Sequence, residues 1–489
     1  MSPHSLQEEF DIDRIAIIGA GPCGLAAAKY FLAEKKFSQV QAFEQRATPG
    51  GVWNYTPEHG EKQFRLPRTA PTEEPDEPVY APGSAAPTFV SPVYDLLETN
   101  IPQTLMNYCD KPFPDGCALF PTHATVLRYL EEYAEDLSEH LVMSTQVLKV
   151  SKVAGGDDTG GGGPRCWEVE TRDLRSGEVA RRQFDAVLVA SGHYNDPFVP
   201  DIPGLAEFEK RFPGSISHSK FYRRPDQFKD KKVIIVGNSA SGIDLSAQAS
   251  SVSQLPVLIS EKEKAGAKVE VPSWARSVPE IVEFLPEQGR AVRFASGVVE
   301  RDVDAVVFCT GYHYSFPFLR GLDPSVVVPD GGYAAHLWEH VLYTADPTLA
   351  FASIPQRIVP FPVSQAQAAY VARVWAGRLR PPPRPEMEAW VRDLVREKGP
   401  SKAVHNLAVP KDVDYINRLR ELSLGARRKG GLENDGVGKM PPCWGPEQLW
   451  VRERMPLIKL ASRALGERRL HCRSLEELGF DYEASKGGG

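Results

Sequence analysis

Apolar and small residues follow the same order twice along the chain: an apolar run, a glycine-rich turn, a helical stretch and a second apolar run. The first segment, residues 14–46, is RIAIIGAGPCGLAAAKYFLAEKKFSQVQAFEQR, and the second, residues 231–260, is KKVIIVGNSASGIDLSAQASSVSQLPVLIS. A short, continuously apolar run before glycine is typical of a strand buried in a parallel sheet. The pattern therefore predicts two βαβ units, each with its strands joined through a helix.

Two further apolar runs, residues 184–194 and 303–312, end in small residues and flank the second unit in the sequence. One domain inserted into another is the simplest arrangement that gives this order. At 489 residues the chain is also long for a single compact core, which favours two domains. We predict an α/β protein with two dinucleotide-binding, Rossmann-like domains, the second inserted into the first.

The remaining segments predict helices and loops. Helical patterns favour helices at residues 123–137, 361–379 and 385–399. The glycine-rich run at residues 155–163 predicts a surface loop, and the tail at residues 483–489 predicts a disordered end.

Gly19, Gly21 and Gly24 form a GxGxxG pattern between an apolar strand and a helix. The first glycine permits a tight turn, the second lets the backbone approach a pyrophosphate, and the third lets the helix pack on the strand. Glu44 ends the next strand, twenty residues past Gly24 (44 − 24 = 20), where a carboxylate meets an adenosine ribose hydroxyl. We interpret this unit as a dinucleotide site rather than a plain strand–helix turn.

The second unit fills the same motif positions with Gly237, Ser239 and Gly242. Lys262 stands twenty residues past Gly242 (262 − 242 = 20), and a cation there suits the 2′-phosphate of NADPH. Glu261 and Glu263 flank the lysine and offset part of its charge. The pattern favours NADPH over NADH, with a solvated lysine on a turn as the alternative.

Charge and cysteine content narrow the class of protein. The net charge of −7, without a concentrated basic run, argues against a nucleic-acid partner. No apolar stretch has the length a bilayer requires, and the N-terminus lacks a signal-peptide pattern, so we expect a cytoplasmic protein without a membrane partner. The seven cysteines are scattered and include no CxxC pair, which weighs against disulfides, dithiol chemistry and a metal site. The oligomeric state stays open, with a homodimer among the assemblies considered.

Several segments resemble the flavin-containing monooxygenases, in that family's order: GAGPCGL, FEQRATPGGVWNY, YDLLETNIPQTLMNYCDKPFP, FPTHATVLRYLEEYA, FPGSISHSKFY, VGNSASGIDLS and CTGYHYSFPFL. The most specific match is to the family's FxGxxxHxxxF/Y signature, which falls on Phe212, Gly214, His218 and Tyr222. The resemblance covers most of the chain and is to a soluble, microbial or fungal type of member.

This resemblance implies a domain order and two cofactors, FAD and NADPH. The FAD-binding domain takes residues 1–207 and 313–489, with helices in its C-terminal part, and the inserted NADPH-binding domain takes residues 208–312. FAD is expected to lie against Gly19, Gly21, Gly24, Glu44, Arg46, Gly51 and Trp53. NADPH is expected to lie against Gly237, Ser239, Gly242 and Lys262, with the domain closed by Thr310 and Gly311.

The resemblance also implies the reaction. NADPH reduces FAD, the reduced flavin takes up dioxygen as a C4a-hydroperoxide, and one oxygen atom passes to a soft nucleophile of a small molecule, such as an amine, a sulfide or a thiol. This activity, of the N,N-dimethylaniline monooxygenase type, requires that water is kept from the flavin. Asn100 matches the asparagine that the family places where oxygen reacts, and it is the predicted catalytic residue.

Two rival activities stay open. Baeyer–Villiger monooxygenases, which oxidise ketones, carry a tryptophan–proline pair after the signature histidine, whereas this chain has Tyr222 and Arg223. The other rival is an uncoupled NADPH oxidase, because a fold does not settle an activity. His218 lies where the chain enters the inserted domain, which predicts a structural role there rather than proton transfer. Gln365 stands where the family more often has glutamate, so the resemblance implies less about the C-terminal part.

Overall fold

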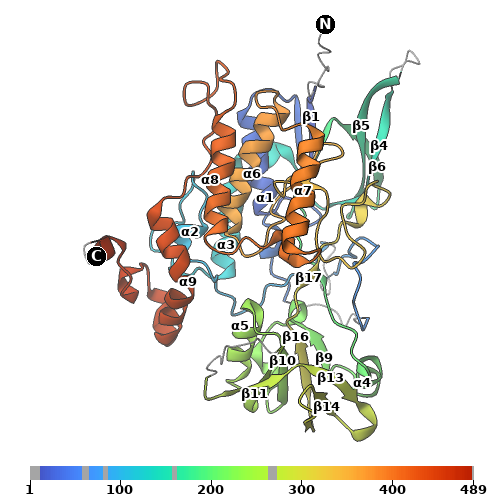
Figure 1. Cartoon of the computed structure of the whole chain (residues 1–489), viewed down its shortest axis with the longest axis vertical. Helices are drawn as coiled ribbons and strands as arrows, with labels where there is room; N and C mark the ends of the chain where they lie inside the picture. The colour runs from blue at the N-terminus through green and yellow to red at the C-terminus, as the bar shows by residue number, and fades with distance from the viewer. Residues whose placement is uncertain (1–10, 58–64, 81–85, 157–161, 263–271, 487–489) are drawn as a thin grey trace.

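The computed structural model of the chain describes residues 11–57, 65–80, 86–156, 162–262 and 272–486. Two α/β bodies lie one above the other in Figure 1, with the N-terminus and most helices in the upper body and the middle of the chain in the lower one. The centre of the predicted glycine-rich loop, residues 157–161, lies outside the described residues.

A seven-stranded sheet forms the upper body. Its strand order is β18 (Leu337–Trp338), β19 (Leu342–Tyr343), β20 (Leu349–Phe351), β7 (Ala186–Val189), β1 (Arg14–Ile18), β2 (Gln39–Phe43) and β3 (Leu141–Val142). β1 pairs in parallel with β2 and with β7, and α1 (Pro22–Ala33) connects β1 to β2. The first predicted βαβ unit is therefore present at the centre of this sheet.

A five-stranded parallel sheet forms the lower body. Its strand order is β12 (Ala275–Pro279), β11 (Gln254–Glu261), β10 (Lys232–Val236), β16 (Ala305–Phe308) and β9 (Ile216–His218). α5 (Ala240–Ala249) connects β10 to β11, as the second βαβ unit predicts. The chain then returns to the upper sheet through β18 to β20, so the predicted two-domain α/β architecture is confirmed.

The two chain segments that join the bodies lie side by side. β8 (Asp196–Pro197) leads toward the lower body, β17 (Tyr312–His313) leads back from it, and the two pair antiparallel. Adjacent entry and exit points explain how one domain is inserted into the other without disturbing its sheet.

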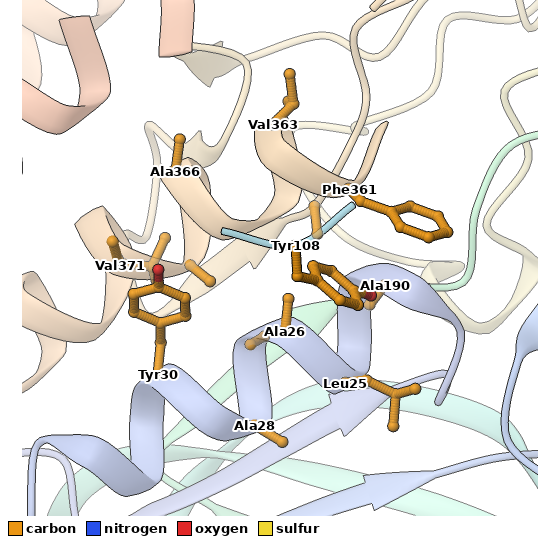
Figure 2. Packing of buried hydrophobic residues seen from close by; sticks show 14 of the residues in the cluster. Leu25, Ala26, Ala28, Tyr30, Tyr108, Ala190, Phe361, Val363, Ala366 and Val371 are labelled. Carbon is orange, nitrogen blue, oxygen red and sulfur yellow. The ribbon is translucent and has the colours of Figure 1, made fainter. Parts of the chain in front are cut away.

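Helix α6 (Pro360–Trp375) forms the centre of the core beside α1. Every residue of α6 from Phe361 to Trp375 is buried, as expected for a helix covered on all sides. Figure 2 shows the Tyr108 side chain between α6 and α1. Its ring stacks on Phe361 with centroids 5.0 Å apart, and its hydroxyl donates to the Pro22 carbonyl (2.7 Å), which anchors the first residue of α1.

The other helices cover the upper sheet and one end of the molecule. They are α2 (Gln103–Met106), α3 (His123–Tyr133), α7 (Arg384–Lys398), α8 (Lys411–Leu424), α9 (Pro446–Ala464) and α10 (Tyr482–Lys486). The helix predicted over 123–137 ends at Tyr133 and continues as a 3-10 helix over Glu135–His140. Residues 483–486, predicted to be disordered, belong to α10, so that prediction is wrong for them.

The remaining elements are short or peripheral. They are α4 (Leu205–Arg211), the antiparallel strands β4 (Thr145–Gly156), β5 (Gly162–Asp173) and β6 (Val179–Phe184), and the antiparallel strands β13 (Ile281–Leu285), β14 (Ala291–Phe294) and β15 (Val299–Glu300). In the described part of the chain, every helix is too short or too polar to cross a bilayer.

Candidate dinucleotide sites

The turn after β1 has the backbone geometry that the first glycine motif predicts. Gly19 adopts a φ of +103°, and a Cβ atom there would lie 2.7 Å from the Ala190 carbonyl oxygen. A Cβ atom on Gly24 would lie 1.9 Å from the Gly19 carbonyl oxygen, so any larger residue would push α1 away from the turn. Gly21 caps α1 without a side-chain hydrogen bond, which leaves the N–H groups of the first helical turn for an anion.

Glu44 directly follows β2, and its side chain contacts the glycine turn at Ala20. Its side chain is buried; Oε2 accepts a hydrogen bond from the Ala20 N–H (2.9 Å) and Oε1 accepts one from the Arg46 N–H (2.9 Å). Two backbone donors offset the cost of burying a carboxylate and fix its direction. Burial lowers the pKa of the Arg46 guanidinium, against the opposing effect of Glu44.

A second loop covers the first glycine turn. The Gly50 N–H donates to the Ala20 carbonyl (2.9 Å), and a Cβ atom on Gly51 would lie 2.9 Å from the Cα atom of Gly21. Trp53, two residues on, is partly buried against the main hydrophobic cluster of the upper body. The seven residues predicted for FAD thus lie on one turn and the two segments that adjoin it.

This set of groups fits FAD. The uncapped start of α1 suits a pyrophosphate, the fixed carboxylate of Glu44 suits a ribose hydroxyl, and the glycines let a ligand approach the backbone. The assignment of these seven residues to FAD stays a prediction.

The turn after β10 repeats the geometry of the first turn. Gly237 adopts a φ of +102°, a Cβ atom there would lie 2.7 Å from the Cys309 carbonyl oxygen, and a Cβ atom on Gly242 would lie 1.9 Å from the Gly237 carbonyl oxygen. Ser239 caps α5 in an extended conformation and is exposed. The groups fit the pyrophosphate of a second dinucleotide, here with an open approach.

Lys262, predicted to meet the 2′-phosphate of NADPH, directly follows β11. Its side chain is 88% exposed, and its Nζ lies 3.8 Å from a carboxylate oxygen of Glu280. Glu261 is the last residue of β11, and Glu263 lies outside the described residues. The lysine is free to reorient toward a ligand, because an exposed ion pair at this distance holds it only weakly.

Thr310 and Gly311 lie at the junction between the two bodies. The Thr310 hydroxyl donates to the Phe198 carbonyl (2.5 Å), and the Gly311 carbonyl accepts from the Phe198 N–H (2.9 Å). His218 is fully buried beside them, with Nε2 3.1 Å from the Gly311 carbonyl and Nδ1 accepting from the Lys220 N–H (3.1 Å). Burial lowers the pKa of His218 to about 3, so the ring is neutral. These contacts support a structural role at the junction.

Asn100, the predicted catalytic residue, lies exposed in a loop whose neighbours are fixed. The Thr99 N–H donates to the Pro121 carbonyl (2.9 Å), and the Thr99 carbonyl accepts from the Lys459 ammonium on α9 (2.8 Å). Lys459 also lies 3.7 Å from a carboxylate oxygen of Glu98. The contacts of this loop therefore run to α9, and they leave the Asn100 side chain open to solvent.

Sequence reasoning missed the role of α9, which reaches both bodies. Lys459 holds the Asn100 loop, and one turn later Arg463 pairs with Asp244 on α5 (3.1 Å). The cationic residues one turn apart were visible in the sequence, but their partners lie hundreds of residues away. Positions four residues apart share one helix face, which was the only local signal.

A groove of about 560 Å³ lies elsewhere, between α7 and α8. It is lined by side chains such as His340, Trp390 and Arg418, and by none of the residues of the glycine turns or of the Asn100 loop. We therefore place the candidate site at the glycine turns and not in this groove.

Comparisons with known proteins agree with this geometry. Residues 88–279 and 275–433 match the family model described as flavin-binding monooxygenase-like, and residues 17–78 match the NAD(P)-binding Rossmann-like domain. The first family match covers well over half of the chain.

Three individual proteins illustrate the similarity. The flavin-containing monooxygenase ustF2 of Aspergillus flavus is 29% identical over 457 residues, which cover 83% of this chain and 90% of the relative. The thiol-specific monooxygenase of Saccharomyces cerevisiae is 30% identical over 446 residues, which cover 86% and 88%. The solved structure of S-allyl-L-cysteine S-oxygenase from Allium sativum superposes with a TM-score of 0.73 and 27% identity, covering 97% of this chain and 98% of that one.

The two family matches together span both glycine turns and the segments that join the two bodies. FAD and NADPH are the cofactors that this family and its NAD(P)-binding domain support. The chain belongs to the flavin-binding monooxygenase-like family, and it is a flavin-dependent monooxygenase.

Proposed function

We propose that the protein is an NADPH- and dioxygen-dependent monooxygenase that adds one oxygen atom to a sulfur atom, or to a comparably soft nitrogen atom, of a small molecule. The proposal rests on the two glycine turns, which share the same backbone geometry. The turn at Gly19 is covered by the loop at Gly50 and Gly51, whereas the turn at Gly237 is open. The covered turn suits a cofactor that stays bound, and the open turn suits one that exchanges in each cycle.

FAD would lie against the turn at Gly19 with Glu44 on its ribose, and NADPH against the turn at Gly237 with Lys262 near its phosphate. When bound, FAD supplies the activation of dioxygen, which no protein side chain can supply. The protein residues bind and orient the two cofactors and limit access of water. Asn100, on its fixed loop, is proposed to donate a hydrogen bond beside the reacting flavin.

We propose sulfur as the preferred target because of two similar proteins. Two of the similar proteins carry sulfur chemistry in their names: the thiol-specific monooxygenase and the S-allyl-L-cysteine S-oxygenase. The chain covers 88% and 98% of the lengths of these two proteins. A reductase that passes electrons to a disulfide is disfavoured, because the sequence has no CxxC pair that could serve as its dithiol.

The test supplies the purified flavoprotein with NADPH, dioxygen and a panel of thioethers, thiols, amines and ketones, and measures product mass together with NADPH and hydrogen peroxide. We expect products heavier by one oxygen atom, most abundantly from the sulfur compounds, in near-equal amounts to the NADPH consumed. Hydrogen peroxide equal to NADPH with every compound would identify an oxidase, and esters formed from ketones alone would identify the Baeyer–Villiger rival.

Asn100→Ala tests whether the Asn100 side chain contributes to oxygen transfer. The variant is expected to consume NADPH but release more hydrogen peroxide per product. Product yield should fall by about tenfold, which corresponds to about 1.4 kcal/mol for one lost hydrogen bond. Thr104→Ala, at an exposed position four residues on, is the control and should leave the product yield unchanged. Equal product yields in Asn100→Ala and the unsubstituted enzyme would remove Asn100 from the site.

A further inference from the structure

The two βαβ units can be compared residue by residue, because the same backbone hydrogen bond fixes the end of the second strand in each. The Gly19 N–H donates to the Phe43 carbonyl (2.8 Å). The Gly237 N–H donates to the Ser260 carbonyl, also at 2.8 Å. Phe43 and Ser260 are likewise the partners of the last residues of β1 and β10 in the two parallel ladders. Phe43 and Ser260 therefore occupy equivalent positions.

The next residue in each unit is a glutamate. Glu44 follows Phe43, and Glu261 follows Ser260. Lys262 is then equivalent to Gln45 and lies one position beyond the place where a Rossmann fold puts its ribose-binding carboxylate.

The contacts of the two glutamates agree with this alignment. Glu44 Oε2 accepts from the backbone N–H of Ala20, the residue after Gly19. Glu261 Oε2 lies 3.5 Å from the side-chain amide of Asn238, which is the residue after Gly237. The other oxygen of Glu261 accepts from the Ser277 hydroxyl (3.3 Å). Both carboxylates thus lie over the residue that follows the first glycine of their turn.

The Glu261 carboxylate is accessible to a ligand. Among the residues that the structure describes, no Lys, Arg or His side chain lies within 4.0 Å of its carboxylate, and Lys262 is paired with Glu280 instead. Its two partners, Asn238 and Ser277, are neutral, and the residue is only partly buried. A carboxylate in this position accepts hydrogen bonds from a ribose with free hydroxyls, and it repels a phosphate on the same ribose.

We propose that Glu261 is a specificity-determining residue that binds the 2′-hydroxyl of NADH and opposes the 2′-phosphate of NADPH, so that the enzyme accepts NADH as a second reductant. The proposal rests on the proposed function only in that a nicotinamide coenzyme reduces the flavin. Lys262 supplies the cation that retains NADPH, and the adjacent glutamate reduces the preference that the lysine alone would give.

The experiment measures anaerobic bleaching of the visible flavin absorbance after rapid mixing of the holoenzyme with NADPH or NADH over a range of concentrations. The unsubstituted enzyme is expected to be reduced by both, with apparent affinities within about tenfold of each other, equivalent to about 1.4 kcal/mol. Glu261→Gln should raise the ratio of NADPH to NADH affinity by about tenfold, while Lys262→Ala should lower it. The limiting reduction rate at saturating coenzyme should not change, because the substitutions lie at the adenosine end.

Glu283→Gln is the matched control, since it removes one carboxylate from the same body on β13, where the side chain pairs with Arg293 (3.0 Å). It should leave the coenzyme ratio unchanged. An unsubstituted enzyme at least a hundredfold weaker for NADH, or a Glu261→Gln ratio equal to that of Glu283→Gln, would overturn the role of Glu261. Neither result would touch the proposed function, which fails instead if neither coenzyme reduces the flavin.

Discussion

In the upper body Gly21 is buried beneath the loop that carries Gly51, whereas in the lower body Ser239, at the same motif position, is exposed. The two turns are otherwise alike. Their first glycines have φ values of +103° and +102°, and in both turns a Cβ atom added to the third glycine would lie 1.9 Å from the carbonyl oxygen of the first. The difference lies in what the rest of the chain places over each turn. We propose that each glycine motif forms a dinucleotide site and that the cover over the turn decides how long its ligand stays bound.

The covering elements also differ in origin. The first turn is covered by its own domain, through the loop at Gly50 and Gly51 and through Tyr108, which anchors the start of α1. The second turn has no equivalent loop in the inserted domain among the described residues. Its links to residues outside that domain include the Arg463 pair with Asp244 on α5 and the hydrogen bond that the Tyr94 hydroxyl donates to the same carboxylate. An exchangeable coenzyme suits the second arrangement, because release requires no rearrangement of a buried loop.

The largest effects are expected when the same methyl group is added to each turn, which tests whether the two turns bind different cofactors. Gly24→Ala and Gly242→Ala each put a Cβ atom where it would lie 1.9 Å from a carbonyl oxygen, which costs about 3 kcal/mol or more in each domain. Gly24→Ala should abolish flavin binding, measured as the flavin absorbance per protein. Gly242→Ala should keep its flavin and lose reduction by NADPH.

The control for this pair is Gly177→Ala, at a turn where an added Cβ atom meets nothing within 4 Å. It tests the cost of alanine at a positive φ without a collision, since Gly177 has a φ of +77°. Loss of flavin in Gly242→Ala as complete as in Gly24→Ala would contradict the assignment of separate cofactors to the two turns.

The sequence predicted the parts of the site that depend on local pattern. Gly19, Gly24 and Glu44 belong to one continuous βαβ unit, so their spacing carries their geometry. The same counting failed to single out Glu261, because the distance from the third glycine depends on the length of the connection. Phe43 lies nineteen residues past Gly24 (43 − 24 = 19), and the equivalent Ser260 lies eighteen past Gly242 (260 − 242 = 18). Twenty residues past the third glycine therefore reach Glu44 in one unit and Lys262 in the other.

Contacts between distant segments were beyond prediction from one sequence. The Lys459 ammonium meets the Thr99 carbonyl across 360 positions, and neither residue belongs to a motif. Such a contact depends on how α9 packs, and packing is set by the whole core. The position of Asn100 in the family pattern could be predicted, while the helix that holds its loop could not.

The two bodies also differ in how many buried histidines they contain, and this number affects stability at low pH. Three neutral, buried histidines, His193, His340 and His405, lie beside the upper sheet, whereas the lower sheet has His218. Burial lowers the pKa of His193 and His340 to about 4, that of His218 to about 3, and that of His405 well below its ordinary value. Unfolded histidine has a pKa of about 6.5, so below that pH the unfolded chain binds protons that the folded chain does not.

Stability should consequently fall as pH falls from about 6.5 toward 4, by up to about 1.4 kcal/mol per pH unit for each buried histidine. Three histidines against one predict that the upper body loses protection faster than the lower body. Amide hydrogen exchange at pH 7 and pH 5 measures this for each sheet separately. Equal losses of amide protection in both sheets would contradict this prediction. His471→Gln is the control: its position is exposed, so it should change the protection of neither sheet.

The smallest expected effect concerns the link between the two bodies. Arg463→Gln removes the pair with Asp244, whose side chains are 31% and 20% exposed, so the expected cost is about 0.5 kcal/mol. Asp244 keeps other partners, because it also accepts from the Tyr94 hydroxyl and from Gln248 (3.1 Å). The midpoint of thermal unfolding should therefore fall only slightly.

Arg454→Gln is the matched control, since the contacts of Arg454 stay on α9: an ion pair with its neighbour Glu453 (3.4 Å) and a hydrogen bond to the Trp450 carbonyl (3.2 Å). Both variants remove one arginine from α9, but only Arg463 reaches the lower body. If the pair between Arg463 and Asp244 positions the inserted domain for flavin reduction, Arg463→Gln will change the rate of reduction by NADPH while Arg454→Gln will not. Equal reduction rates in both variants, with equally small losses of stability, would mean that the pair has no effect on flavin reduction.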